Sequence, residues 1–171
     1  VFDSGRWLVT LRTLRIAATV TVIEILIAIP FALWLARGVK SAGVKAFVVA
    51  MLTVPFFLSL SSRTIVWRSV LGNTGLINTT LMHLGVIDQP IDWLLFSEFS
   101  VHLGLIGPSF PTMVLPIYMS LSLIDNEILE AGPDLGASPF RVFMDIILPL
   151  ITPGIVAGII FTFVPMLGET V

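Results

Sequence analysis

Residues 16–36 form an apolar run of 21 residues with a single charged side chain, Glu24. As a helix rising about 1.5 Å per residue, this run would measure about 31 Å, enough to cross the hydrocarbon core of a bilayer. Three further apolar runs cover residues 44–60, 101–124 and 151–167. Hydrophobic residues make up 56% of the chain and charged residues only 12%, unlike a soluble domain. The sequence therefore predicts an all-α, polytopic transmembrane helical bundle that forms a single domain over residues 1–171.

Prolines and glycines inside the apolar runs predict how these spans are shaped. Pro55 should kink the second span near its outer end, because proline removes a backbone donor and crowds the preceding turn. The third span contains three prolines, Pro108, Pro111 and Pro116. They should break this span and leave irregular backbone along a pathway wall. In the fourth span, Gly154 and Gly158 permit close approach of another helix.

The composition excludes several classes of function. The chain has no cysteine and only two histidines, His83 and His102, so it predicts no metal site and no redox centre. It contains no G-x-x-x-x-G-K-[ST] phosphate loop, because its only lysines, Lys40 and Lys45, lie in other contexts. No serine and histidine pair has the spacing of an intramembrane hydrolase. The basic residues are scattered, so we expect no nucleic-acid partner, and also no catalytic residue and no cofactor.

A polar segment, residues 125–149, separates the third and fourth spans and predicts two short helices. Asp125 or Asn126 can cap the first helix. The carboxylates of Glu127 and Glu130 lie in its first turn, where the helix dipole favours negative charge. Pro133 should stop or bend this helix, because its ring crowds the carbonyl four residues before it.

The second half of the polar segment predicts a turn followed by an amphipathic helix at the membrane surface. Gly136 can adopt a positive φ and reverse the chain. Ser138 and Pro139 form an N-cap followed by a proline at the first helical position. One stripe of the helix would carry Phe140, Phe143, Met144 and Ile147. Pro149 should end the helix, which makes the segment a compact knob that a partner can grip in a groove.

This polar segment resembles the EAA loop of ABC importer permeases, whose pattern is E-A-A, three residues, G, nine residues, I, one residue, L-P. The matching positions are Glu130, Ala131, Gly136, Ile146, Leu148 and Pro149, while Gly132 stands where the family usually has alanine. In that family the loop docks on the ATP-binding subunit, so the resemblance implies that these seven residues couple the chain to an ATPase. Without the resemblance, Glu130 would be read as a solvated carboxylate in the first turn of a helix.

The resemblance also implies the setting of the chain. It predicts a type I ABC importer permease, multi-pass in the inner membrane, with a dimer of ATPase subunits, a second permease subunit that is identical or homologous, and an external substrate-binding protein. Such permeases commonly have six spans, so we expect a fragment with about four. The loop 125–149 would be cytoplasmic, and residues 61–99, with a short interfacial helix over 71–84, would form an external loop. Positive charges do not choose the orientation by themselves.

Further motifs resemble the polyamine branch of the family. An R-T-x-x-W element begins at Arg63 and ends at Trp67, a G-x-x-G-x-x-N run covers residues 72–78, and a P-x-x-G-E run ends at Glu169. The resemblance implies translocation of a small cation such as spermidine or putrescine. Permeases for iron, thiamine and other small solutes share these elements, so those substrates stay open.

Four residues are candidates for the substrate path: Glu24, Arg63, Trp67 and Glu169. A lone carboxylate in hydrocarbon is costly, so Glu24 should face protein or water, where it meets substrate, pairs with a neighbouring subunit or lies near the interface. Glu169 presents a carboxylate to a cationic substrate or belongs to a frayed span end. Trp67 is more readily explained as an interfacial anchor. The alternative function is an ion-coupled secondary transporter or channel that uses Glu24 and Glu169.

Overall fold

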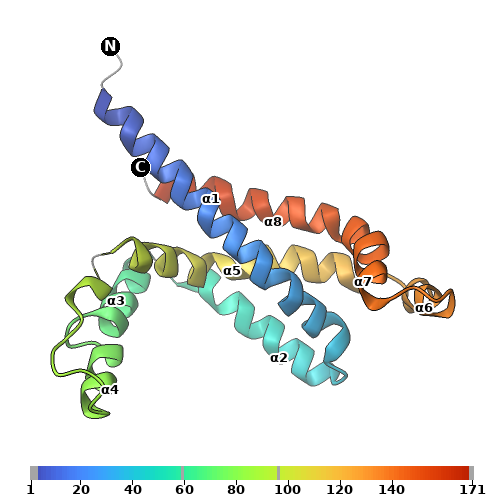
Figure 1. Cartoon of the computed structure of the whole chain (residues 1–171), viewed down its shortest axis with the longest axis horizontal. Coiled ribbons are helices and arrows are strands. Elements are labelled where there is room, and N and C mark those ends of the chain that lie inside the picture. The colour runs from blue at the N-terminus through green and yellow to red at the C-terminus, as the bar shows by residue number, and fades with distance from the viewer. Residues whose placement is uncertain (1–3, 59, 96, 170–171) are drawn as a thin grey trace. The chain divides into compact units, whose positions relative to one another are not determined.

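The structure is a computed structural model that describes residues 4–58, 60–95 and 97–169 (Figure 1). Its elements are α1 (Ser4–Leu33), η1 (Trp34–Gly38), α2 (Ala42–Thr53), η2 (Val54–Phe57), α3 (Leu60–Leu71), α4 (Leu76–His83), η3 (Asp92–Leu94), α5 (Glu98–Ser122), α6 (Asn126–Asp134), α7 (Pro139–Arg141), η4 (Val142–Ile147) and α8 (Leu148–Glu169). All of these elements are helical, and the described residues contain no strand. The predicted all-α class is confirmed.

Among the described residues, three helical stretches are long and apolar enough to cross a membrane: Trp7–Gly38, Glu98–Ser122 and Pro139–Gly168. They overlap the spans predicted over 16–36, 101–124 and 151–167. A fourth apolar stretch, Ala42–Phe57, is shorter and covers most of the span predicted over 44–60. Large apolar side chains on these helices are exposed, among them Leu26, Met119 and Val156. Such surfaces are typical of helices that face lipid or another subunit.

The chain divides into two compact units, Val1–Thr53 with Ser109–Val171, and Val54–Pro108. In the first unit, α1 packs against α8 and against the part of α5 that follows Pro108. The buried core of this unit consists of Ala28, Ala32, Met113, Val114, Ile117, Leu121, Ile124 and Ile151. The two alanines lie on α1, so this helix meets its neighbours through small side chains and its backbone comes close to theirs.

Two glycines bring α8 close to α5 within the first unit. A Cβ atom on Gly154 would lie 2.6 Å from the carbonyl oxygen of Pro116, and one on Gly158 would lie 2.7 Å from Sδ of Met113. Real side chains do not approach so closely, so any larger residue would push the two helices apart. The predicted close approach at Gly154 and Gly158 is confirmed.

The prediction that three prolines break the third span is wrong. α5 continues as one helix through Pro108, Pro111 and Pro116. Each proline removes one amide donor, but its fixed φ suits a helix. A full break in an apolar setting would leave many more backbone groups without partners, so the continuous helix costs less.

The prediction that Pro149 ends a helix is also wrong, because α7, η4 and α8 follow one another without interruption. The amide of Leu148 donates to the carbonyl of Phe143, five residues earlier, so the chain is a π-helix directly before Pro149. Pro149 then falls in the first turn of α8, and the helix continues past it. In a π-helix each amide bonds the carbonyl five residues earlier, in place of four. This shift changes the backbone hydrogen bonding directly before Pro149, which has no amide hydrogen to donate, and so lets the helix continue through it.

The second unit contains more helix than the loop predicted over 61–99. α3 precedes the helix predicted over 71–84, of which the structure forms only α4, and η3 follows. At the start of this unit the chain changes from α2 to the 3-10 helix η2, one residue before Pro55. The change of helix type lies where the kink was predicted, because proline cannot donate to the turn before it.

Asn78 organises the turn between α3 and α4. Its side chain is fully buried, Nδ2 donates to the carbonyl of Gly72 at 3.0 Å, and Oδ1 accepts from the amide of Ile91 at 2.9 Å. The amide of Gly75 donates to the same Gly72 carbonyl at 2.8 Å. A Cβ atom on Gly75 would lie 2.8 Å from that oxygen, so only glycine fits. These contacts explain why glycine and asparagine occupy the last two fixed positions of the G-x-x-G-x-x-N run.

Candidate coupling and transport sites

Residues 125–149, which we call the helical knob, leave the membrane helices at the end of α5 and rejoin them at α8. α6 begins after Asp125, runs past Pro133 by one residue and ends at Asp134. The predicted stop therefore falls just after the proline. α6 packs back on η4, so the knob is a folded unit and not an open loop.

Gly132 lies at the contact between α6 and η4. It is buried, and a Cβ atom there would lie 2.7 Å from Cγ2 of Val142 and 3.4 Å from Cδ1 of Ile146. Val142 therefore occupies the space that an alanine side chain at position 132 would need. Two motif positions, Gly132 and Ile146, meet in this contact.

Gly136 reverses the chain between the two helical parts of the knob. Its φ is 78°, and its amide donates to the carbonyl of Pro133 at 2.8 Å. The amide of Ala137 donates to the carbonyl of Gly132 at 3.0 Å, which closes the turn. The following helix starts with Ser138, whose hydroxyl accepts from the amide of Arg141. The predicted turn and the predicted cap are both confirmed.

The outer surface of the knob combines carboxylates with apolar side chains. Glu130 is exposed and makes no hydrogen bond or ion pair with any described residue. The exposed large apolar residues of the knob are Ile128, Leu135, Phe140 and Met144, and Leu135 is 88% exposed. Such a surface is suited to binding in a groove on another protein, because burial of its exposed apolar side chains there would be favourable.

The stripe predicted over Phe140, Phe143, Met144 and Ile147 is only partly formed. Phe140 and Met144 are exposed, whereas Ile147 packs against the buried core of the first unit. The prediction assumed an α-helical period, but residues 142–147 form a π-helix, whose larger turns shift side chains three or four positions apart away from a common stripe. Leu148 likewise packs on the core, so this motif position anchors the knob to the bundle.

Arg37 joins the end of the first membrane helix to the knob. Its Nη2 donates to the carbonyl oxygens of Leu121 at 2.8 Å and Ile124 at 2.6 Å, and Nη1 donates to Oδ1 of Asn126 at 2.5 Å. Leu121 belongs to the last turn of α5, and Asn126 is the first residue of α6. One guanidinium therefore connects η1, α5 and α6.

Glu24 lies among hydroxyl groups in the middle of the first unit. Its side chain has no exposed surface, and Oε1 accepts from the hydroxyl of Ser109 at 2.5 Å. Thr162 of α8 is its other polar neighbour, and that hydroxyl lies 2.9 Å from the hydroxyl of Thr112. Oε2 of Glu24 is buried and has no hydrogen-bond partner. The arrangement, which we call the oxygen cluster, presents only oxygen atoms and no basic side chain among the described residues.

Of the other three candidates for the substrate path, the structure describes the side chain of Trp67 alone. The ring of Trp67 lies on the glycine face of α5 within the second unit, where a Cβ atom on Gly107 would lie 3.1 Å from its Cζ2 atom. This ring also lines an apolar pocket of about 200 Å³ with Pro55 and Pro108. The side chains of Arg63 and Glu169 lie outside the described residues.

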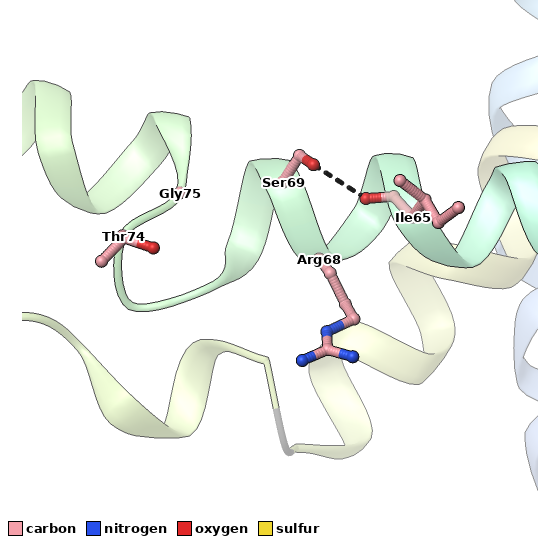
Figure 2. Close-up of a pocket in the computed structure, with 5 residues that line it drawn as sticks. All are labelled: Ile65, Arg68, Ser69, Thr74 and Gly75. Atoms are coloured by element: carbon pink, nitrogen blue, oxygen red, sulfur yellow. Dashed lines mark hydrogen bonds between the residues drawn. The ribbon is translucent and has the colours of Figure 1, made fainter.

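A second, more polar pocket of about 440 Å³ adjoins the turn that Asn78 organises (Figure 2). It is lined by Ile65, Arg68, Ser69, Thr74 and Gly75. In Figure 2 the Arg68 side chain extends away from its helix, and the hydroxyl of Ser69 donates to the carbonyl of Ile65 at 2.9 Å. An arginine repels a cationic ligand, so this pocket does not suit an amine.

Sequence reasoning missed most partners of these sites. Nothing in the sequence marks Arg37, Ser109, Thr112 or Thr162 as members of a site. A hydroxyl residue gives no sequence signal by itself, because serine and threonine in apolar helices usually bond their own backbone. No group of three or more acidic or histidine residues that could hold a metal occurs in the described parts of the chain.

Long apolar helices joined by a folded knob of this kind are the architecture of a multi-pass membrane protein. Residues 15–171 match the family described as binding-protein-dependent transport system inner membrane component, and the chain belongs to this family. The family match and the apolar helices together make it a multi-pass inner membrane protein.

Several curated relatives are similar over most of the chain. The spermidine/putrescine transport system permease protein PotB of Escherichia coli (strain K12) is 36% identical over 160 residues, which are 94% of this chain and 57% of that protein. PotB of Haemophilus influenzae is 33% identical over 92% of this chain and 54% of the relative. The inner membrane ABC transporter permease protein YdcU of E. coli is 32% identical over 99% of this chain and 57% of the relative. The chain thus spans little more than half the length of these relatives.

Proposed function

We propose that the chain is part of the membrane-spanning permease subunit of an ABC importer and carries its coupling element. The observation behind this is the helical knob, in which the motif glycines allow tight packing while Glu130 and the apolar side chains remain exposed. A folded knob between two membrane helices can pass a push from a partner into both of them. Membership of the transport family supports the same function.

The partners follow from this function. A dimer of ATPase subunits would hydrolyse ATP and grip the knob, so this chain would contribute no catalytic residue. A second permease subunit, identical or homologous, would complete the pathway, and an external binding protein would deliver the substrate. In this arrangement residues 125–149 are cytoplasmic, and residues 61–99 lie on the outer side. The apolar surfaces of the membrane helices are available for lipid and for the second permease subunit.

The substrate we propose is a polyamine such as spermidine or putrescine. The two PotB proteins are named as permeases of spermidine/putrescine transport systems, and YdcU is named as an inner membrane ABC transporter permease. The oxygen cluster around Glu24 supports a cation, because an ammonium group donates three hydrogen bonds and needs oxygen acceptors around it. Opening of the helices around Glu24 would expose its unpartnered Oε2 atom to the pathway. We propose that Arg63, Trp67 and Glu169 line the same pathway.

The ATPase contact can be tested by co-purification. The full-length subunit would be expressed with its ATPase and purified in detergent as wild type, Glu130→Lys and Asp88→Lys. Glu130→Lys should lose the ATPase, because it reverses a charge on the exposed face of α6. Asp88→Lys makes the same charge change on an exposed residue outside the knob and should keep the ATPase. A wild-type subunit that binds no ATPase would contradict the proposed function.

The substrate path can be tested separately by uptake into liposomes that contain the whole complex. Glu24→Gln preserves the shape of the side chain and a hydrogen bond to Ser109, but removes the negative charge. We expect spermidine uptake to fall at least tenfold, with the complex still assembled. Uptake that needs an ion gradient and no ATP would instead favour the secondary transporter with Glu24 and Glu169 as ion sites. Unchanged uptake in Glu24→Gln would remove Glu24 from the path.

A further inference from the structure

Arg37 is placed where the first membrane helix, the end of α5 and the knob meet. Its guanidinium reaches three acceptors: the carbonyl oxygens of Leu121 and Ile124 and the side chain of Asn126. Its Nε atom is buried and has no partner, so these three contacts alone fix the orientation of the group. The planar fork of arginine holds several acceptors in one fixed geometry, which a lysine cannot do.

The three acceptors lie in the last turn of α5, in the connection that follows it and at the start of α6. The last carbonyls of a helix lack a helical partner, and a cation there also meets the negative end of the helix dipole. The contact with Leu121 therefore caps the end of α5, and the contact with Ile124 holds the connection just beyond it. The contact with Asn126 is different, because Asn126 is the first residue of α6 and needs no cap from Arg37. It ties the knob itself to η1.

Only residues 123–125 connect α5 to α6, and α6 is otherwise held by its packing on η4. The hydrogen bond from Arg37 to Asn126 adds a direct link between the first residue of α6 and η1. With this link present, a displacement of α6 would pull on η1 and α1. Without it, α6 would keep its packing on η4 but lose this direct link to the first membrane helix.

We propose that Arg37 is a positioning residue that passes the movement of the knob into the first membrane helix through its bond to Asn126. This inference rests on the proposed function, since it assumes that a partner moves the knob. Lys45 provides a comparison within the same region. Its Nζ donates to the carbonyl of Ala36 at 2.6 Å, so it also places a positive charge near a helix end, but this hydrogen bond does not reach α6.

The test uses the full-length permease with its ATPase and binding protein in liposomes, and measures spermidine uptake per ATP hydrolysed. Asn126→Ala leaves Arg37 free to cap α5 and removes only the tie to α6. It should lower uptake per ATP by about threefold to tenfold, the range of an ordinary hydrogen bond, because this bond is exposed to solvent. Arg37→Lys should lose at least as much. Asn126→Asp keeps an acceptor for Arg37 and should restore coupling, and Lys45→Met should stay within twofold of wild type.

A second measurement does not depend on transport. In the full-length subunit, amide hydrogen exchange in α6 should become faster by a similar factor in Asn126→Ala, while exchange in α8 stays unchanged. The proposal is overturned if α6 exchanges as in the wild type, or if Lys45→Met uncouples as strongly as Asn126→Ala. A wild-type complex that takes up no spermidine would contradict the proposed substrate, and the exchange experiment would still decide whether Arg37 ties α6 to η1.

Discussion

Cγ2 of Val142 lies 2.7 Å from the position that a Cβ atom on Gly132 would occupy. Val142 is itself 8% exposed, so the two residues form the tight centre of the contact between α6 and η4. The family pattern usually has alanine at the position of Gly132. In this chain the methyl group comes instead from Val142, on the opposite side of the same contact.

Gly132→Ala should therefore destabilise the knob unless Val142 becomes smaller. Overpacking a tight contact costs about 1–3 kcal/mol. In Gly132→Ala with Val142→Ala, the new methyl group takes the place of the lost one, and the stability should return towards wild type. A double-mutant cycle on the thermal unfolding of the purified full-length subunit measures this coupling. Additive effects of the two substitutions would contradict the contact.

Gly136→Ala should weaken the knob through backbone conformation alone. The φ of Gly136 is 78°, where an L side chain costs about 1–2 kcal/mol. Nothing lies near the position of its missing Cβ atom, so no steric clash contributes. The measurement is ATPase binding by the full-length subunit, which should fall in Gly136→Ala and recover in Gly136→Asn, because asparagine tolerates this conformation.

Gly85 provides the control for this strain, since its φ is 69° and its surroundings are also open. It lies outside the knob, at the end of α4. Gly85→Ala should carry the same backbone cost and leave ATPase binding unchanged. Equal loss of ATPase binding in the two alanine variants would mean that general instability, and not the shape of the knob, causes the effect.

The local features of the knob were predictable because they depend on neighbours in the sequence. The positive φ of Gly136 and the cap at Ser138 follow from the residue types and their order. A local interpretation of the sequence also overestimates how strongly proline breaks these helices. Pro111 and Pro149 look like breaks in a local reading, but an apolar environment penalises broken helices more than a missing amide donor.

The contacts that build the candidate sites join residues far apart in the sequence. Arg37 and Asn126 are separated by 89 positions, and Glu24 and Ser109 by 85. No periodicity or local motif encodes which partner a buried polar group chooses after the helices pack. The sequence does predict that Glu24 needs a protein or water environment, and the structure places it wholly within protein.

Asn78→Ala should loosen the second unit. The substitution removes two hydrogen bonds from a fully buried side chain and leaves the carbonyl of Gly72 and the amide of Ile91 without these partners. The expected cost is about 1–3 kcal/mol, because the amide of Ile91 loses its partner while the carbonyl of Gly72 still accepts from the amide of Gly75. Limited proteolysis between α4 and η3 should become faster. Asn73→Ala removes one exposed hydrogen bond, to Asp92, and should leave the cleavage rate near that of wild type.

Gly158→Leu should separate α8 from α5 and destabilise the first unit. The new side chain would begin 2.7 Å from Sδ of Met113 and 3.2 Å from its carbonyl oxygen, and only the sulfur can move aside. Because the backbone must shift, we expect a loss of roughly 3 kcal/mol or more, at the upper end for overpacked cores. Gly168→Leu on the same helix meets open space and should unfold at the wild-type temperature. Thermal unfolding of the full-length subunit in detergent compares the two variants, and equal midpoints would show that α8 does not pack on α5 through Gly158.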